Sequence, residues 1–265
     1  MSIKIYVTTH KKYRMPNDKM YIPIQSGCAL YPDLGYQRDD VGDNISDKNA
    51  AYNNLCPLYW AWKHSDADYI GIVHYRRHFL GPKKKNWAGI LTKEEAEKLC
   101  KKYPIIMPTK SHYPFFTMES HYINTFKELK RIHTNDLKTL RKVIADLYPG
   151  CEKAYDKVMK KSSGHQGNIS IMRKDYFDSY CSFMFSILFE CEKRLQGHRH
   201  DYNRYIAGIS EFIPDIWLEY NGYKYAELKL FKPEEPSTIR RIYNLGMRMF
   251  FGKRDPHRYN PNTPK

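Results

Sequence analysis

The chain has 265 residues, of which 42% are hydrophobic and 15% aromatic, enough apolar surface to bury a core and to exclude a wholly disordered chain. Lysine and arginine outnumber aspartate and glutamate by 44 to 29, which gives a formal net charge of +15. Because unpaired buried charges are too costly, this excess must face solvent or an anionic partner: nucleic acid, an acidic membrane surface or a phosphorylated small molecule.

The first segments of the chain read as a strand, a long loop and a helix. Residues 3–7 are β-branched and aromatic and predict a buried strand, whose end carries Thr8 and His10. Residues 11–43 contain several prolines and glycines and no sustained period, so we expect a long functional loop. Ser46 is a plausible N-cap for the following helix, with a kink or restart expected at Pro57.

Strands and helices alternate through the rest of the chain. Residues 69–73 and 105–107 predict strands, and between them Thr92 and Glu95 form a capping box for a helix that runs to about Tyr103. Helical patterning covers about 120–160, with breaks near 133–135 and 149–150. A strand at 168–172, helices at 175–194 and about 202–220, and a strand at 223–231 follow. This alternation predicts an α/β fold with a mostly parallel or mixed sheet.

The six cysteines and the N-terminal segment indicate in which cellular compartment the protein is expected. The cysteines form no C-x-x-C pair, which argues against a zinc ribbon or a disulfide scaffold and predicts reduced, mostly buried thiols. The apolar run at 3–7 is too short for the core of a signal peptide and far shorter than the ~20 residues that span a bilayer. We therefore expect a cytoplasmic protein.

The strongest local signal lies where the second strand ends. Residues 71–73 lead directly into His74, Tyr75, Arg76 and Arg77, so cationic donors follow a buried strand. Open α/β sheets bind ligands at the carboxyl ends of their strands, and arginine forms charge-assisted hydrogen bonds with phosphate. A diphosphate could be held there; the alternative is an ordinary solvated basic strand end.

The same region resembles a known family. The runs Asn44-Ile45-Ser46-x-x-Asn49, Leu58-Tyr59-Trp60-Ala61-Trp62-Lys63 and His74-Tyr75-Arg76-Arg77-His78-Phe79 are similar to the pattern of the DUF4422 family of capsular and exopolysaccharide glycosyltransferases. Further similarity at 4–11, 168–172, 180–192 and 208–211 extends it from residue 1 to about 231. The resemblance implies a glycosyltransferase-A-like (Rossmann-like) mixed sheet flanked by helices, in a domain over 1–236.

The resemblance also implies how the donor is held. In many such enzymes a D-x-D pair after the strand equivalent to 69–73 binds a divalent metal, but here His74 and Arg76 take that place. A literal D-x-D at 66–68 precedes the strand, so we interpret it as a loop at the opposite edge of the sheet. We hypothesise that Arg76 and Arg77 supply positive charge to the leaving nucleoside diphosphate. No cofactor is firmly predicted, although manganese or magnesium is possible.

Sugar transfer with inversion requires a base for the acceptor hydroxyl, normally an aspartate or glutamate. Glu211, expected on a late helix, is the first candidate, and Glu119, expected in a loop after the 105–107 strand, is the second. The alternative for each is a surface carboxylate or a structural ion pair.

Polar residues at strand ends and in loops are candidates for donor recognition. Thr8, His10, Asp43 and Asn44 suit the edges of uracil and ribose, and Asp43 could instead cap the following turn. Asn168 is a candidate for binding sugar hydroxyls, with a local turn as the alternative.

The tail predicts a membrane contact. Residues 237–254 read as a basic amphipathic helix that carries Arg240, Arg241, Arg248, Met249 and Phe250 and suits the surface of an anionic bilayer. The alternative is a helix that packs against its own domain or a partner chain. A lipid-linked acceptor would lie at the inner face of the plasma membrane, so a peripheral location there is expected.

The combined prediction is a hexosyltransferase that uses a UDP-sugar and a polyprenyl-diphosphate-linked saccharide. By family analogy alone the donated sugar is galactofuranose or galactose. Two rivals remain: a basic nucleic-acid-binding module, although no nucleic-acid motif is present, and a non-catalytic scaffold of a glycan assembly complex.

Overall fold

A computed structural model describes residues 1–82, 86–127, 134–196 and 204–234. Residues Met1–Phe231 form one compact unit, and Lys232–Lys265 form a second. The predicted tail helix, with the membrane-binding candidates at 240, 241 and 248–250, lies outside the described residues.

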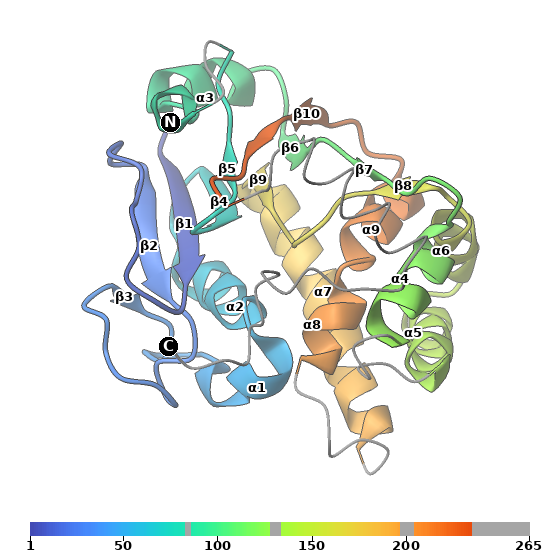
Figure 1. The fold of residues 1–265 in the computed structure, drawn as a ribbon. Coiled ribbons are helices and arrows are strands. Elements are labelled where there is room, and N and C mark those ends of the chain that lie inside the picture. The colour runs from blue at the N-terminus through green and yellow to red at the C-terminus, as the bar shows by residue number, and fades with distance from the viewer. Residues whose placement is uncertain (83–85, 128–133, 197–203, 235–265) are drawn as a thin grey trace, which may run out of the picture. The chain divides into compact units, whose positions relative to one another are not determined.

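A seven-stranded sheet forms the centre of the first unit, with the order β10-β6-β9-β4-β1-β2-β3 (Figure 1). Every strand is parallel to the others except β9, which runs antiparallel to both of its neighbours. The strands of this sheet are β1 (Ile3–Thr9), β2 (Tyr21–Gln25), β3 (Gln37–Arg38), β4 (Tyr69–His74), β6 (Ile105–Pro108), β9 (Ser170–Arg173) and β10 (Ala226–Leu228). Two short ladders pair β5 (His78–Phe79) with β11 (Leu230–Phe231) and β7 (Ser111–His112) with β8 (Ser163–Gly164).

The antiparallel β9 determines what lies at the carboxyl edge of the sheet. Thr8 of β1 pairs with His74 of β4, and Ile72 of β4 pairs with Ser170 at the start of β9. The residues just before β9 therefore lie beside the residues that follow β4. The end of β9 lies at the opposite, amino edge, where Arg173 pairs with Tyr69.

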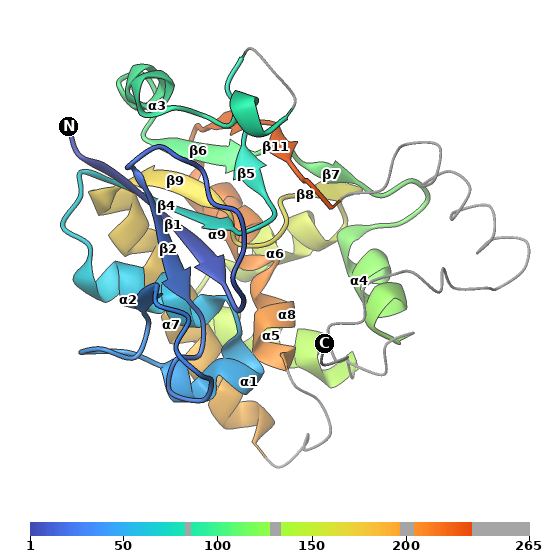
Figure 2. The same cartoon turned by 60° about the vertical axis from the view of Figure 1, so that its left-hand side comes forward.

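Helices cover both faces of the sheet (Figure 2). On one face, α2 (Leu55–His64), α7 (Lys174–Leu195) and α9 (Ile213–Asn221) share a buried cluster with Tyr6 and Ile72; on the other, α3 (Lys93–Cys100) shares one with Ile5 and Val73. Because both faces are buried, β4 can be apolar along almost its whole length. The remaining helices are η1 (Ser46–Lys48), α1 (Asn49–Tyr52), η2 (Trp87–Gly89), α4 (Met118–Lys127), α5 (Thr134–Leu147), α6 (Glu152–Met159) and α8 (Tyr205–Ser210).

Most predicted elements are confirmed. The strands at the start of the chain, at 69–73 and at 105–107, the long helix after 174 and the Thr92–Glu95 capping box are all present. The six cysteines are free and buried, as expected. Among the described residues no helix combines the length and the apolar character needed to cross a bilayer.

The prediction of a continuous loop over 11–43 is wrong, because β2 and β3 lie within it. Pro23 stands in the middle of β2, and a proline in a run normally argues against a strand. Here β3 pairs only with Ile24 and Gln25, so at Pro23 one side of β2 is an open edge that needs no N–H donor.

Two helix boundaries also differ from prediction. Ser46 caps no helix; its hydroxyl instead donates to Asp39 Oδ1 at 2.6 Å. The break falls at Asn53, whose φ is 49°, so Pro57 lies in the first turn of α2, where its missing N–H has no intrahelical partner to lose.

The single helix expected over 202–220 is two helices, α8 and α9. Pro214 stands in the first turn of α9, where proline is favoured. In the interior of one long helix the same proline would remove a hydrogen bond and clash with the preceding turn. Glu211 lies in the break between them.

Candidate functional site

Arg77 lies beyond β4 and stands over the turn that precedes β9. Its backbone N–H donates to the carbonyl of His74 at 2.8 Å. Gly167, whose φ is +82°, faces the guanidinium so closely that a Cβ there would lie 2.7 Å from Arg77 Nη1. Any larger residue at 167 would displace the guanidinium, so the glycine serves both the left-handed turn and this close approach.

His74 joins the same turn to the end of β4. Its Nε2 lies 2.7 Å from the carbonyl oxygen of Gly167 and must carry the proton to donate to it. Burial, reinforced by the nearby Arg77 charge, lowers the pKa of His74 to about 3. The imidazole is therefore neutral near pH 7, and the positive charge at this edge comes from the arginines.

Glu211 faces the same edge from the break between α8 and α9. Burial raises the pKa of its carboxyl group above the usual value, and the Arg77 charge partly opposes that rise. Within the described ranges, no carboxylate lies in ion-pair contact with the Arg77 guanidinium. Arg77 and Glu211 therefore lie at the same edge of the sheet without forming an ion pair.

Asn168 connects these two groups. It has a left-handed φ of 51°, and its Nδ2 donates to Ser210 Oγ at 2.8 Å while Tyr180 donates to its Oδ1 at 3.4 Å. The side chain is buried and is occupied by protein groups at both ends. It therefore fixes the residue before Glu211 against the start of β9.

The predicted donor-binding residues at the end of β1 lie near this cluster. Thr8 is buried and pairs with His74, whereas His10 is exposed and contacts the edge of the Tyr75 ring at 5.4 Å. The guanidinium of Arg76 lies 5.5 Å from the same ring.

The other predicted residues lie elsewhere. Asp43 accepts a hydrogen bond from Tyr59 at 3.0 Å and lies 3.5 Å from Lys63, along α2, while Asn44 accepts the backbone N–H of Ser46 at 3.1 Å. Glu119 is exposed in the first turn of α4, a helix rather than the predicted loop.

The D-x-D sequence lies at the amino edge, before β4, as expected. Asp66 pairs with Lys4 at 2.5 Å, and Asp68 accepts the backbone N–H of Ser2 at 2.7 Å. In the part of the chain that the structure describes, no three His, Cys, Asp or Glu residues gather as metal ligands do. The arginines at the carboxyl end of β4 have no lone pair for a metal, and the Nε2 of His74 already contacts the Gly167 carbonyl at 2.7 Å.

A cleft of about 170 Å³ adjoins Glu211, and no sequence pattern predicted it. It lies between the segments after β7 and β8, helix α4 and the α8–α9 break. Its lining residues are Tyr113, Met118, His121, Tyr122, His165, Gln166, Glu211 and Phe212. These residues are scattered over about 100 positions, so no local motif could reveal them.

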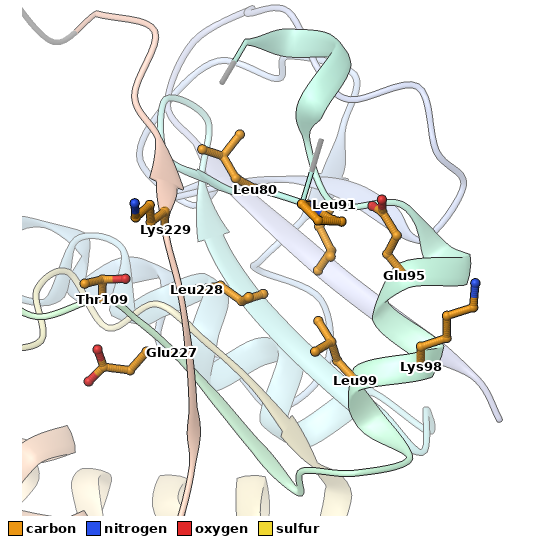
Figure 3. A pocket seen from close by; sticks show the side chains of 11 residues that line it. Leu80, Leu91, Glu95, Lys98, Leu99, Thr109, Glu227, Leu228 and Lys229 are labelled. Atoms are coloured by element: carbon orange, nitrogen blue, oxygen red, sulfur yellow. The ribbon is translucent and has the colours of Figure 1, made fainter. Parts of the chain in front are cut away.

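A larger pocket of about 660 Å³ lies between α3 and β10 (Figure 3). Leucines 80, 91, 99 and 228 supply much of its wall, and neither Arg77 nor Glu211 lines it. Its size alone does not make it the place of the chemistry, because it lacks the convergent polar groups of the carboxyl edge.

Comparison with known proteins agrees with this architecture. Residues 4–222 match the family described as "Domain of unknown function (DUF4422)". The chain belongs to the DUF4422 family. No curated protein matches this DUF4422 chain.

Among solved structures, the DUF4422 chain is similar to the apo structure of WbbM, a bifunctional glycosyltransferase. The TM-score is 0.80 and the sequence identity 27%, over 89% of this chain but only 46% of WbbM. The predicted family and the predicted glycosyltransferase-like α/β fold are therefore confirmed. This chain spans about half the length of WbbM.

Proposed function

We propose that this chain is a glycosyltransferase that takes a sugar from a nucleotide-sugar donor bound at the carboxyl edge of the sheet. The observation that carries this proposal is the Arg77 guanidinium, which faces Glu211 there without a carboxylate in ion-pair contact. The similarity to WbbM, a glycosyltransferase, supports the reaction class.

Arg77 binds the donor diphosphate. A guanidinium offers paired N–H donors to phosphate oxygens and stays charged at every physiological pH. Arg76 lies one residue away and adds a second positive charge, and neutral His74 anchors the turn beneath them. Thr8 and His10, at the end of β1, are proposed to contact the nucleoside.

Glu211 takes the proton of the acceptor hydroxyl in an inverting transfer. The acceptor oxygen forms a bond to the anomeric carbon while the bond from that carbon to the diphosphate oxygen breaks. The electron pair of the broken bond goes to the diphosphate, whose developing charge Arg77 stabilises. The raised pKa of Glu211 makes its carboxylate a stronger base than an exposed glutamate.

The finer substrate assignment follows the family resemblance. We propose UDP-galactofuranose or UDP-galactose as donor and a polyprenyl-diphosphate-linked saccharide as acceptor, in the synthesis of a capsular or other surface polysaccharide. The basic segment at 237–254, with its arginines at 240, 241 and 248, would hold the enzyme on the anionic inner face of the plasma membrane. Deletion of 237–265 should abolish binding to anionic liposomes; unchanged sedimentation would refute the anchor.

The test of the function is an assay of the full chain with a panel of UDP-sugars and a lipid-linked saccharide acceptor, with products identified by mass. We expect one donor to give an acceptor heavier by one sugar residue, together with saturable UDP binding. Absence of both turnover and UDP binding across the panel, with and without manganese, would refute the proposal.

A further inference from the structure

The cleft beside Glu211 has a preorganised aromatic wall. The rings of Tyr113 and His121 stack with centroids 4.0 Å apart and planes 20° apart. Tyr113 accepts a hydrogen bond from Gln166 Nε2 at 2.9 Å, and Gln166 in turn accepts one from Ser111 at 3.2 Å. Since these contacts already fix the rings, a ligand that lies against them loses little additional side-chain entropy in this part of the site.

A buried polar pair supports the other part of the cleft. Both oxygens of Asp215 are used by His165, one at 2.8 Å from its backbone N–H and the other at 2.7 Å from Nδ1. Gly164 lets these elements approach, because a Cβ there would lie 3.0 Å from Asp215 Oδ2 and closer still to Met118. His165 is 3% exposed, and its Nε2 makes no hydrogen bond among the described residues but lies 3.5 Å from the Glu227 carboxylate.

The size of the cleft limits what it can hold. Sites for drug-sized ligands commonly measure about 300–1,000 Å³. At about 170 Å³ the cleft is too small for a nucleoside diphosphate. An aromatic wall combined with carboxylate, amide and imidazole groups suits a single sugar ring, which has an apolar C–H face and a rim of hydroxyl groups.

An exposed aromatic side chain lies close in sequence to two residues that line the cleft. Phe115 is 96% exposed and has a left-handed φ of 69°, an uncommon and strained state for a bulky residue. In the sequence Phe115 lies between Tyr113 and Met118, both of which line the cleft. Backbone strain of this kind motivates a functional hypothesis, and the hypothesis here is a ligand contact.

We infer that this cleft binds the terminal sugar ring of the saccharide acceptor, with the reacting hydroxyl at Glu211 and Phe115 beside the next ring. This inference rests on the proposed function, because it takes Glu211 as the base. It adds the acceptor position: the donor diphosphate lies on the Arg77 side of Glu211, and the acceptor ring lies on the Tyr113 side.

The test uses the full chain and two variants, His121→Ala in the wall and Phe115→Ser in the adjoining segment of the chain. Saturation-transfer NMR with methyl glycosides of galactopyranose, galactofuranose, glucose, rhamnose and N-acetylglucosamine, in the presence of UDP, should show binding of at least one glycoside. Each variant should weaken that binding about tenfold, equivalent to about 1.4 kcal/mol. Tyr103→Ser, a control at an exposed position between α3 and β6, should leave it unchanged.

Measurements on the donor alone distinguish failure of this inference from failure of the proposed function. In both variants UDP affinity and hydrolysis of the donor by water should stay at the wild-type level. Wild-type glycoside binding in both variants, no glycoside binding by the wild type, or loss of UDP affinity in the variants would each overturn the acceptor cleft. Absence of UDP binding and donor turnover in the wild type would instead overturn the proposed function.

Discussion

The two edges of the central sheet differ in how their charged side chains are paired. At the amino edge, Asp66 is paired with Lys4 and Asp68 with the start of the chain, so the exposed carboxylates there already have partners. At the carboxyl edge, Arg77 and Glu211 face each other without direct pairing, over a turn whose two residues, Gly167 and Asn168, both have positive φ. Charges that lack a direct partner are typical of ligand sites, so we place the proposed donor site at the carboxyl edge.

A comparison of two hollows in the first unit supports the same conclusion. The pocket in Figure 3 is the larger, but its walls are mainly leucine side chains and aliphatic stems. The smaller cleft is lined by Glu211 and by His165, whose Nδ1 lies 2.7 Å from Asp215 Oδ1. A reacting site needs a few convergent polar groups as well as volume.

The largest effect is expected at Glu211. Glu211→Gln removes the base with little change in shape, and turnover should fall roughly 100- to 10,000-fold, the usual contribution of general base catalysis. The wild-type rate should also fall as the pH drops through the raised pKa of Glu211, at a value above 4.5. Asp66→Asn, the matched change at the amino edge, should leave turnover intact; near-normal turnover in Glu211→Gln would remove Glu211 from the mechanism.

Arg77→Gln should weaken UDP binding about 10- to 150-fold, because a hydrogen bond to a charged group contributes about 1.5–3 kcal/mol. Isothermal titration calorimetry with UDP measures this directly. Arg173→Gln is the control, since Arg173 lies at the amino edge and is paired with Asp175 at 2.7 Å. Equal UDP affinity in the two variants would show that Arg77 does not bind the donor diphosphate.

A smaller effect is expected on stability. Burial lowers the pKa of His78 to about 4, from 6.5 when unfolded, so the unfolded chain binds the proton more tightly. Stability is therefore fully present above pH 6.5 and falls as the pH drops from there towards 4, by up to about 1.4 kcal/mol per pH unit for one proton.

Urea unfolding at pH 7, 6 and 5 tests this titration. The pH dependence should become shallower in His78→Gln, whose amide can still donate to the Tyr75 carbonyl that His78 now contacts at 3.0 Å. His112→Gln, at an exposed position, serves as the control. An unchanged slope in His78→Gln would contradict a buried neutral imidazole.

The strands and their ends could be read from the sequence because their signals are local. The apolar run before His74 and the basic residues after it placed Arg77 at the carboxyl edge, and the order of the helices gave the α/β class. Pro23 misled the prediction because its tolerance depends on a neighbouring strand that pairs with only two residues of β2.

The second half of the candidate site depends on long-range contacts. Asn168 reaches Ser210 across 42 positions, and His165 reaches Asp215 across 50. Gly167 lies beside Arg77 because β9 runs antiparallel to β4, and a strand pattern does not encode that direction. Glu211 was predicted as a candidate, but the cleft beside it was not.

The most direct test is a crystal structure of the full chain with UDP bound. The account predicts that diphosphate oxygens lie within hydrogen-bonding distance of the Arg77 guanidinium, above Gly167 and beside Glu211. A nucleotide bound at the amino edge near Asp66 and Asp68, or in the apolar pocket against α3, would contradict it.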